Sequence, residues 1–339
     1  MGPPSPGNTQ SASRGLSPSF KHSPDHPSGA QSRCSRGNCA DGTFALHTGL
    51  RRREGAVLET VALLLVLSSA FLHAAWNALL KRHPNPEVGV VSVIAVSMVG
   101  GGLWTLGMRG QAFPTAQGFA WALGAGACES IYLASLSRAL KQAPLGLTYT
   151  VSRGGAMLLV WPVSVLWLGE AVSVWMVCGV VLLGLGLLVM NLSRPAGPAA
   201  SGVAWAALAA VCIAGYHLSY KLSLGQGSQP PALFATGLLV ALPVLVVERV
   251  RKLGWATLKR EVVMSPGLVI IAGIVCTLSF ALLLSALGSS GAGVVLTLRN
   301  TSITFALALA ALQGERLGRR QLTGAALVAV GAVLLGVPG

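Results

Sequence analysis

The sequence predicts an all-α polytopic membrane protein, with ten transmembrane helices arranged as two inverted five-helix repeats. Its 339 residues are 53% hydrophobic and only 10% charged, whereas a soluble domain carries about 25% charged residues. Apolar runs long enough to span a bilayer, about 20 residues each, recur from Val57 onward, and the second half of this array repeats the first. Such spans must be helical, because lipid cannot satisfy backbone hydrogen bonds.

The composition excludes a cytosolic enzyme or a nucleic-acid-binding domain as the main interpretation, because too few polar side chains remain to cover a soluble surface. The net charge of +14 does not change this. The basic residues lie in an N-terminal tail and in short connections, where membrane proteins carry them. We expect a lipid bilayer and a small-molecule substrate as partners, no nucleic acid, and a monomeric state.

The first 55 residues differ from the rest of the chain. They are rich in Pro, Gly and Ser and show no apolar period, so they cannot bury a core. We expect residues 1–55 to be either a disordered tail or an extension from a start codon placed too far upstream. The first five-helix repeat is then expected at residues 57–190 and the second at residues 202–338.

Proline, glycine and charged residues mark the joints between the apolar runs. The fourth and fifth runs are separated only by Gly169-Glu170, and the longest connection, Glu248 to Ser265, is too small for an extramembrane domain. Lys and Arg concentrate in the connections after odd-numbered runs, which predicts that these connections are cytoplasmic and that both termini lie outside. The predicted spans are residues 57–80, 87–108, 118–140, 145–168, 171–190, 202–222, 232–248, 266–287, 291–312 and 319–338.

Matching residues link the two halves of the membrane part. Each half has five spans, an odd number, so the second half must enter the membrane from the opposite side, which makes the repeat inverted. The paired positions are Ala139-Leu140 and Ala286-Leu287, Arg153 and Arg299, Gly169-Glu170 and Gly314-Glu315, Gly179 and Gly324, Gly186 and Gly331, and Lys81 and Lys221.

Three stretches resemble a known family. Residues 71–81, with the sequence FLHAAWNALLK, close the first span. Leu168-Gly169-Glu170 precedes a Gly-rich span that ends at Asn191, and residues 312–315, LQGE, repeat the acidic motif. Together they resemble the EamA-type members of the drug/metabolite transporter superfamily, over residues 57–338. The resemblance implies ten helices in two inverted halves, a central cavity and transport of small metabolites.

Three ionisable residues fall deep inside predicted spans: Glu129, Arg153 and Arg299. None matches a motif of that family, and each costs at least ~2.5 kcal/mol at a helix centre. One hypothesis is a salt bridge between Glu129 and one arginine that only locks helices together. The other is an anion-binding centre, because one carboxylate cannot neutralise two guanidinium groups and a substrate carboxylate or phosphate would supply the missing charge. Glu129 would then be the proton-coupling group, because substrate at the arginines would release its carboxyl to take up a proton.

Polar and aromatic residues recur at i,i+3 or i,i+4 spacing on the same spans, so they share helix faces. Trp and Tyr also anchor helices at the bilayer interface, and His73 fits a helix-packing role as well as a ligand role. The substrate-binding candidates beside Arg153 and Arg299 are Trp76, Asn77, Tyr149, Tyr216 and His217.

The remaining acids and motifs indicate structure rather than chemistry. Glu170 and Glu315 each precede a helix, and each suits the positive dipole of the helix that follows it. The sequence has no P-loop, no HExxH and no paired-cysteine site, so we expect no cofactor, no metal and no catalytic residue.

These observations predict a secondary transporter that moves a small metabolite across the plasma (inner) membrane by alternating access. The expected substrate is an amino acid, an organic anion or a drug-like compound, exported by means of a proton or substrate gradient. The alternative is a lipid or polyprenyl-phosphate flippase of the same fold. An intramembrane enzyme is disfavoured, because the sequence lacks a catalytic constellation.

Overall fold

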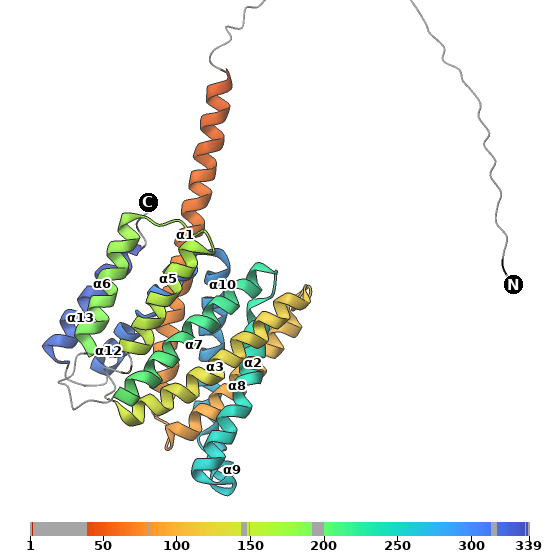
Figure 1. Cartoon of the computed structure of the whole chain (residues 1–339), viewed down its shortest axis with the longest axis vertical. Coiled ribbons are helices and arrows are strands. Elements are labelled where there is room, and N and C mark those ends of the chain that lie inside the picture. The colour runs from red at the N-terminus through yellow and green to blue at the C-terminus, as the bar shows by residue number, and fades with distance from the viewer. Residues whose placement is uncertain are drawn as a thin grey trace, which may run out of the picture. The chain divides into compact units, whose positions relative to one another are not determined.

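In the computed structural model, every described element is a helix (Figure 1). The described residues are 2, 39–80, 82–143, 148, 150–191, 200–312, 317–335 and 337. Met1–Gly49 and Leu50–Gly339 are separate units, and the description below concerns the second unit. The tail prediction for residues 3–38 lies outside the described residues.

The two halves of the membrane part contain similar numbers of helices. In the first half they are α1 (Cys39–Leu80), α2 (Pro86–Gly107), α3 (Ala116–Gln142), the π-helical turn η1 (Thr150–Gly154), α5 (Gly155–Leu166) and α6 (Val174–Asn191). In the second half they are α7 (Ala200–Gly225), α8 (Pro230–Leu253), α9 (Trp255–Val262), α10 (Pro266–Ser289), α11 (Ala292–Arg299), α12 (Ser302–Leu312) and α13 (Arg319–Leu335).

Seven of the described helices are long and apolar enough to cross a membrane, which confirms the prediction of an all-α polytopic membrane protein. Two shorter apolar helices, Val151–Leu166 and Val174–Val189, and α13 coincide with the other three predicted spans. The count of ten helices and the inversion of the repeat stay predictions. The seven are Thr60–Leu80, Pro86–Gly107, Ala116–Leu136, Ser201–Gly225, Pro230–Leu253, Pro266–Ser289 and Ala292–Leu309.

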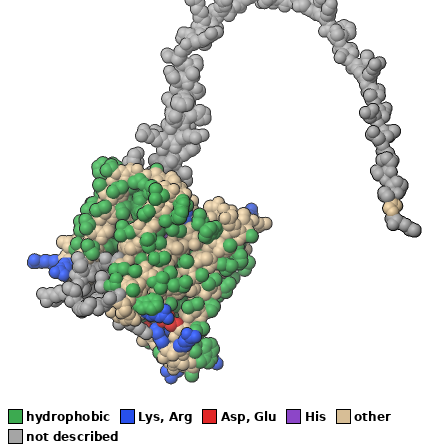
Figure 2. Space-filling model, viewed as in Figure 1, with side chains coloured by type: hydrophobic (Ala, Val, Ile, Leu, Met, Phe, Trp, Pro, Cys, Tyr) green, Lys and Arg blue, Asp and Glu red, His purple; other side chains and the backbone are tan. Residues whose placement is uncertain are grey.

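The outer surface of the bundle is apolar. Leu106, Trp167 and Val174 are 83%, 85% and 68% exposed, and hydrophobic side chains cover much of the face shown in Figure 2. Water would penalise such a surface, whereas lipid tails accept it. The exposed apolar side chains therefore face the bilayer.

Two helices extend beyond their predicted apolar spans. The first helix begins at Cys39, so residues 39–55 of the expected tail are helical, whereas its membrane-spanning part, Thr60–Leu80, agrees with the predicted span 57–80. Hydropathy locates only the apolar part of a helix, and the Ala, Leu and Arg residues upstream of Val57 are good helix formers. In the long connection, α8 continues to Leu253 and a further short helix, α9, follows it.

The fourth and ninth spans are interrupted where unbroken helices were expected. The described part of the fourth span opens with a π-helical turn that contains Arg153, and the ninth span divides into α11 and α12 directly after Arg299. The amides of Asn300 and Thr301 bond carbonyls three residues back, at 3.1 and 3.0 Å, which tightens the chain into a 3₁₀-type turn. Both irregularities thus lie at the two arginines that the repeat pairs.

Glycines let two pairs of helices approach closely. A Cβ on Gly179 would lie 2.8 Å from the carbonyl oxygen of Gly331, and one on Gly186 would lie 2.7 Å from that of Gly324. The sequence repeat matches Gly179 with Gly324 and Gly186 with Gly331, so the contact between α6 and α13 is reciprocal, the pattern that a two-fold axis produces. Between α3 and α8, Gly126 meets the backbone in the same way, as small residues at membrane helix interfaces do.

We predict that Gly179→Ala and Gly186→Ala each destabilise the protein by about 1–3 kcal/mol, because the added methyl overpacks a backbone contact that cannot yield. The measurement is the melting temperature in detergent. Gly124→Ala is the matched control, since no atom lies within 4 Å of its added methyl and alanine favours the helix. Equal melting temperatures for all three variants would contradict the close contact.

Candidate functional site

Arg299 is the last residue of α11 and its side chain is buried, with 2% exposed. Its Nη1 donates to the Ser69 carbonyl and hydroxyl oxygens at 2.7 and 2.6 Å and to the Ser279 hydroxyl at 3.2 Å. Its Nη2 lies 2.9 Å from Nδ1 of His73, and its guanidinium carbon lies 5.2 Å from the centre of the Phe280 ring. The acceptors come from α1 and α10, so this one side chain joins three helices.

The two serines also bond to each other's backbone. The Ser69 hydroxyl donates to the Ser279 carbonyl at 2.5 Å, and the Ser279 hydroxyl donates to the Ser69 carbonyl at 2.9 Å. These reciprocal bonds fix α1 against α10 whether or not a guanidinium is present. All of the acceptors around Arg299 are therefore neutral and already held in place.

On the first span, His73 connects Trp76 to Arg299. Trp76 Nε1 donates to His73 Nδ1 at 3.2 Å, and Arg299 Nη2 points to the same nitrogen. Both are donors, so Nδ1 must carry the lone pair of a neutral ring. Asn77 donates to the His73 carbonyl at 2.7 Å, a bond within its own helix. Trp76 therefore belongs to the Arg299 cluster, and His73, expected to be a ligand or a packing residue, is the link.

Glu129 of α3 is 7% exposed and accepts a hydrogen bond of 3.2 Å from Tyr220 of α7. Gly237 of α8 makes room for this pair, because a Cβ there would clash with the Tyr220 hydroxyl. None of the three ion pairs among the described residues includes Glu129. The salt-bridge hypothesis required an arginine as the partner of Glu129. The structure instead gives it the phenol of Tyr220.

Tyr216 of α7 contacts two other rings in this part of the protein. Its ring is 6.0 Å from that of Tyr132 and 4.1 Å from that of His217. It is also within electrostatic range of Glu129, Arg153 and Arg299. The structure therefore brings Glu129, Arg153, Arg299, Tyr216 and His217 into one region.

Two buried polar groups in this region have no hydrogen-bond partner in the described part of the chain. His217 Nδ1 lies 2.9 Å from the Ile213 carbonyl, which can only accept, so Nε2 carries a lone pair, and that atom is buried without a donor. Asn300 is 1% exposed, and both its amide oxygen and its amide nitrogen lack partners. An unmet buried polar group costs about 1–3 kcal/mol, so these groups suit a ligand.

The remaining predicted residues are placed as follows. Arg153 is half-buried in η1, and its charge acts on that of Arg299, which is a repulsion. Tyr149 and Glu315 lie outside the described residues. Sequence reasoning missed Ser69, Ser279 and Asn300. Only Asn300 carried a signal, as an amide next to an arginine in an apolar span.

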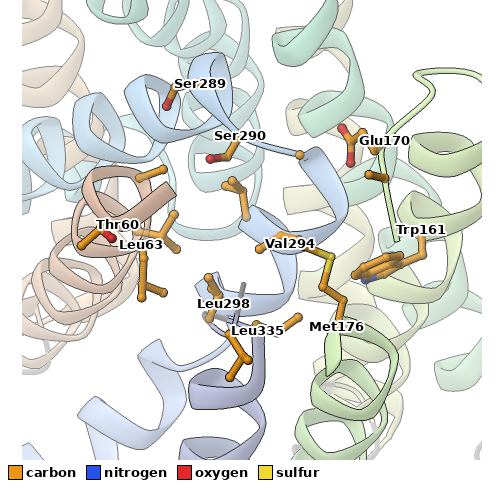
Figure 3. A pocket seen from close by; sticks show the side chains of 16 residues that line it. Thr60, Leu63, Trp161, Glu170, Met176, Ser289, Ser290, Val294, Leu298 and Leu335 are labelled. Atoms are coloured by element: carbon orange, nitrogen blue, oxygen red, sulfur yellow. The ribbon is translucent and has the colours of Figure 1, made fainter. Parts of the chain in front are cut away.

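A cavity of about 340 Å³ lies between α1, α5 and α11 (Figure 3). Thr60 and Leu63 of α1 lie on one side of it and Trp161 and Glu170 on the other, with α11 between them. Its lining also includes Val66 and Leu298. Val66 is one turn before Ser69 on α1, and Leu298 precedes Arg299, so these two lining residues lie within about one helical turn of members of the arginine cluster along their helices.

Arg299→Met is predicted to leave the melting temperature in detergent unchanged or to raise it. A buried guanidinium that only neutral groups hold is poorly compensated for its lost hydration, and the two serines keep their mutual bonds without it. If Arg299 were instead a packing element, the variant would melt clearly earlier than the parent. The Ser69→Ala/Ser279→Ala double variant, which does remove bonds between helices, supplies the comparison for such a loss.

Comparisons with known proteins agree with this description. Residues 200–337 match the EamA-like transporter family. No curated protein matches the chain, whereas 27 chains of solved structures do. One of these, titled only "Crystal structure of protein", has a TM-score of 0.65 and 18% identity, and the match covers 83% of this chain and 96% of the other. That likeness shows the fold alone. The family match confirms, over residues 200–337, the resemblance to EamA-type transporters of the drug/metabolite transporter superfamily that the sequence indicates.

Proposed function

We propose that the protein is a secondary transporter that binds a small anionic metabolite at Arg299 and Arg153 and moves it across the plasma membrane by alternating access. The substrate carries a carboxylate or phosphate, as amino acids and organic anions do, and the expected direction is export. The family match supports transport as such. The anionic substrate rests on the site itself.

The observation that carries this proposal is the buried, positively charged cluster around Arg299. Its guanidinium is surrounded by hydroxyls, a carbonyl and a neutral imidazole, and Arg153 adds a second positive charge within electrostatic range. In a low dielectric such a pair repels strongly. An anion that enters between them relieves that repulsion and can accept two parallel hydrogen bonds from a guanidinium.

The neighbouring polar groups would give the site its selectivity. His217 Nε2 can accept a hydrogen bond, and the Asn300 amide can both donate and accept. An ammonium or hydroxyl on the substrate would satisfy the histidine, which favours a substrate that carries a donor beside its anionic group. Trp76, 8% exposed, offers an apolar and aromatic wall for the rest of the molecule.

Alternating access is supported by the contacts between the two halves. The reciprocal glycine contacts of α6 and α13 are the contacts expected of halves related by a two-fold axis. Rocking of one half against the other would expose a fixed site to each side in turn.

Arg299→Lys and Arg153→Lys are predicted to lower kcat/KM for transport by roughly 10- to 100-fold, because a charged hydrogen bond contributes about 1.5–3 kcal/mol and lysine cannot reproduce the bidentate geometry. The assay is uptake into proteoliposomes, first with a panel of radiolabelled amino acids and organic anions. Arg251→Lys, on the exposed end of α8, is the matched control. Uptake at the parental rate by both site variants would exclude the anion site.

Glu129→Gln is predicted to leave substrate binding measurable and to abolish stimulation of uptake by a pH gradient, since the amide cannot carry a proton across. Binding is followed by the substrate-dependent rise in melting temperature, and coupling by uptake with and without an imposed gradient. Glu248→Gln, which alters an ion pair with Lys252 on α8, should behave as the parent protein. Full stimulation in the Glu129 variant would contradict the coupling role.

The alternative, a flippase of the same fold, can be distinguished from the transporter in the same proteoliposomes. Scrambling of a labelled phospholipid or polyprenyl phosphate, without uptake of any soluble compound, would favour it over the proposed transporter.

A further inference from the structure

The joint between α10 and α11 consists of two residues, Ser290 and Gly291. The last carbonyls of α10 and the first amides of α11 have no partners within their own helices, so groups from elsewhere must satisfy them. Two charged side chains, Glu170 and Lys221, occupy these positions. Glu170 was expected to serve the helix that follows it, and Lys221 was identified only as the repeat partner of Lys81.

Glu170 accepts hydrogen bonds from the first turn of α11. Its Oε1 takes the Ala292 amide at 2.6 Å and its Oε2 takes the Gly293 amide at 3.4 Å. A Cβ on Gly291 would lie 2.6 Å from the same carboxylate, so the glycine permits this approach. The prediction that Glu170 serves its own following helix, α6, is therefore wrong. It stabilises α11 of the second half, where its charge also suits the positive end of the helix dipole.

Lys221 holds the other side of the joint. Its Nζ donates to the Leu287 carbonyl at 2.8 Å and to the Ser290 carbonyl at 2.6 Å. A cation at the end of a helix is favourable, and Lys221 and Glu170 attract each other across the joint. The two cavities of this region, about 340 and 380 Å³, both have Glu170 and Ser290 in their walls.

The joint lies eight residues from the arginine cluster. α11 runs from Ala292 to Arg299, a rise of about 12 Å, and its far end is held by Ser69 and His73 of α1. The short helix is thus attached to the first half of the chain at both ends, by Glu170 at one and by α1 at the other.

We propose that Glu170 and Lys221 are positioning residues that hold α11 in place and thereby set the position of the Arg299 guanidinium. This rests on the proposed function only for its effect on transport. The Glu170 contact joins the two halves, whereas the Lys221 contact lies within the second half. Glu170 therefore attaches α11 to the first half, and Lys221 stabilises the joint within the second half.

The experiment is hydrogen–deuterium exchange of the full-length protein in nanodiscs, read on peptides that cover residues 288–302. Loss of a carboxylate cap should speed exchange of the first turn of α11 by roughly tenfold. Glu170→Ala should show this throughout α11, and the isosteric Glu170→Gln should show a smaller change. Lys221→Met should speed exchange as well, and Lys221→Arg, which keeps the donors, should restore the parental rate. Glu248→Ala is the matched control and should leave these peptides unchanged.

Unchanged exchange in both Glu170 variants would overturn the proposal, and so would faster exchange of every helix alike, which indicates general destabilisation. Uptake of the compound panel into proteoliposomes supplies the second readout. Glu170→Ala should raise KM for an anionic substrate, as expected of a misplaced guanidinium, and parental uptake despite faster exchange would overturn the positioning role alone. If the parent protein takes up none of the compounds, the transport proposal fails. The exchange result still decides whether Glu170 and Lys221 hold α11 in place.

Discussion

Much of this structure depends on one constraint: a guanidinium deep in an apolar bundle must find its hydrogen bonds inside the protein. Arg299 meets this requirement with α1 and α10, and its own helix stops directly after it. Lipid supplies neither water nor a counter-ion at that depth, so the serines must already be in place to receive the charge. Their reciprocal bonds provide that preorganisation, which a helix of leucines could not.

The same constraint explains why the irregular backbone lies where it does. Helices in lipid gain little by burying apolar area against each other, so close packing at glycines, as between α6 and α13, has to hold the frame. A chain that breaks its helix inside such a frame exposes amides and carbonyls. At the α10–α11 joint Glu170 and Lys221 take up these groups, and after Arg299 a tight turn does so. Charged side chains within the membrane part can therefore satisfy the backbone as well as bind a ligand.

Hydropathy was sufficient for the architecture but not for the site. The apolar runs predicted all seven long spans, because the length of a span is a local property of the sequence, and the EamA-like motifs predicted the family. The start of α1 and the break after Arg299 were missed, since a helix can continue or stop for reasons that average hydropathy does not record. Ser69 and Ser279 were missed for a deeper reason. A serine in a membrane helix usually bonds its own backbone, and nothing in the sequence pairs two serines 210 residues apart.

The charged residues also show the difference between what the sequence predicts and what tertiary packing determines. Glu129, Arg153 and Arg299 were identified from their cost in lipid, but the partner of each depends on tertiary packing, and Glu129 meets Tyr220 instead of an arginine. Buried polar groups that lack a hydrogen-bond partner are informative, because folded proteins pair nearly all such groups. His217 and Asn300 depart from that rule, and the acceptors that hold the nearby Arg299 are all neutral. A ligand with an anionic group and a neighbouring donor would pair with Arg299 and with these unpaired polar groups.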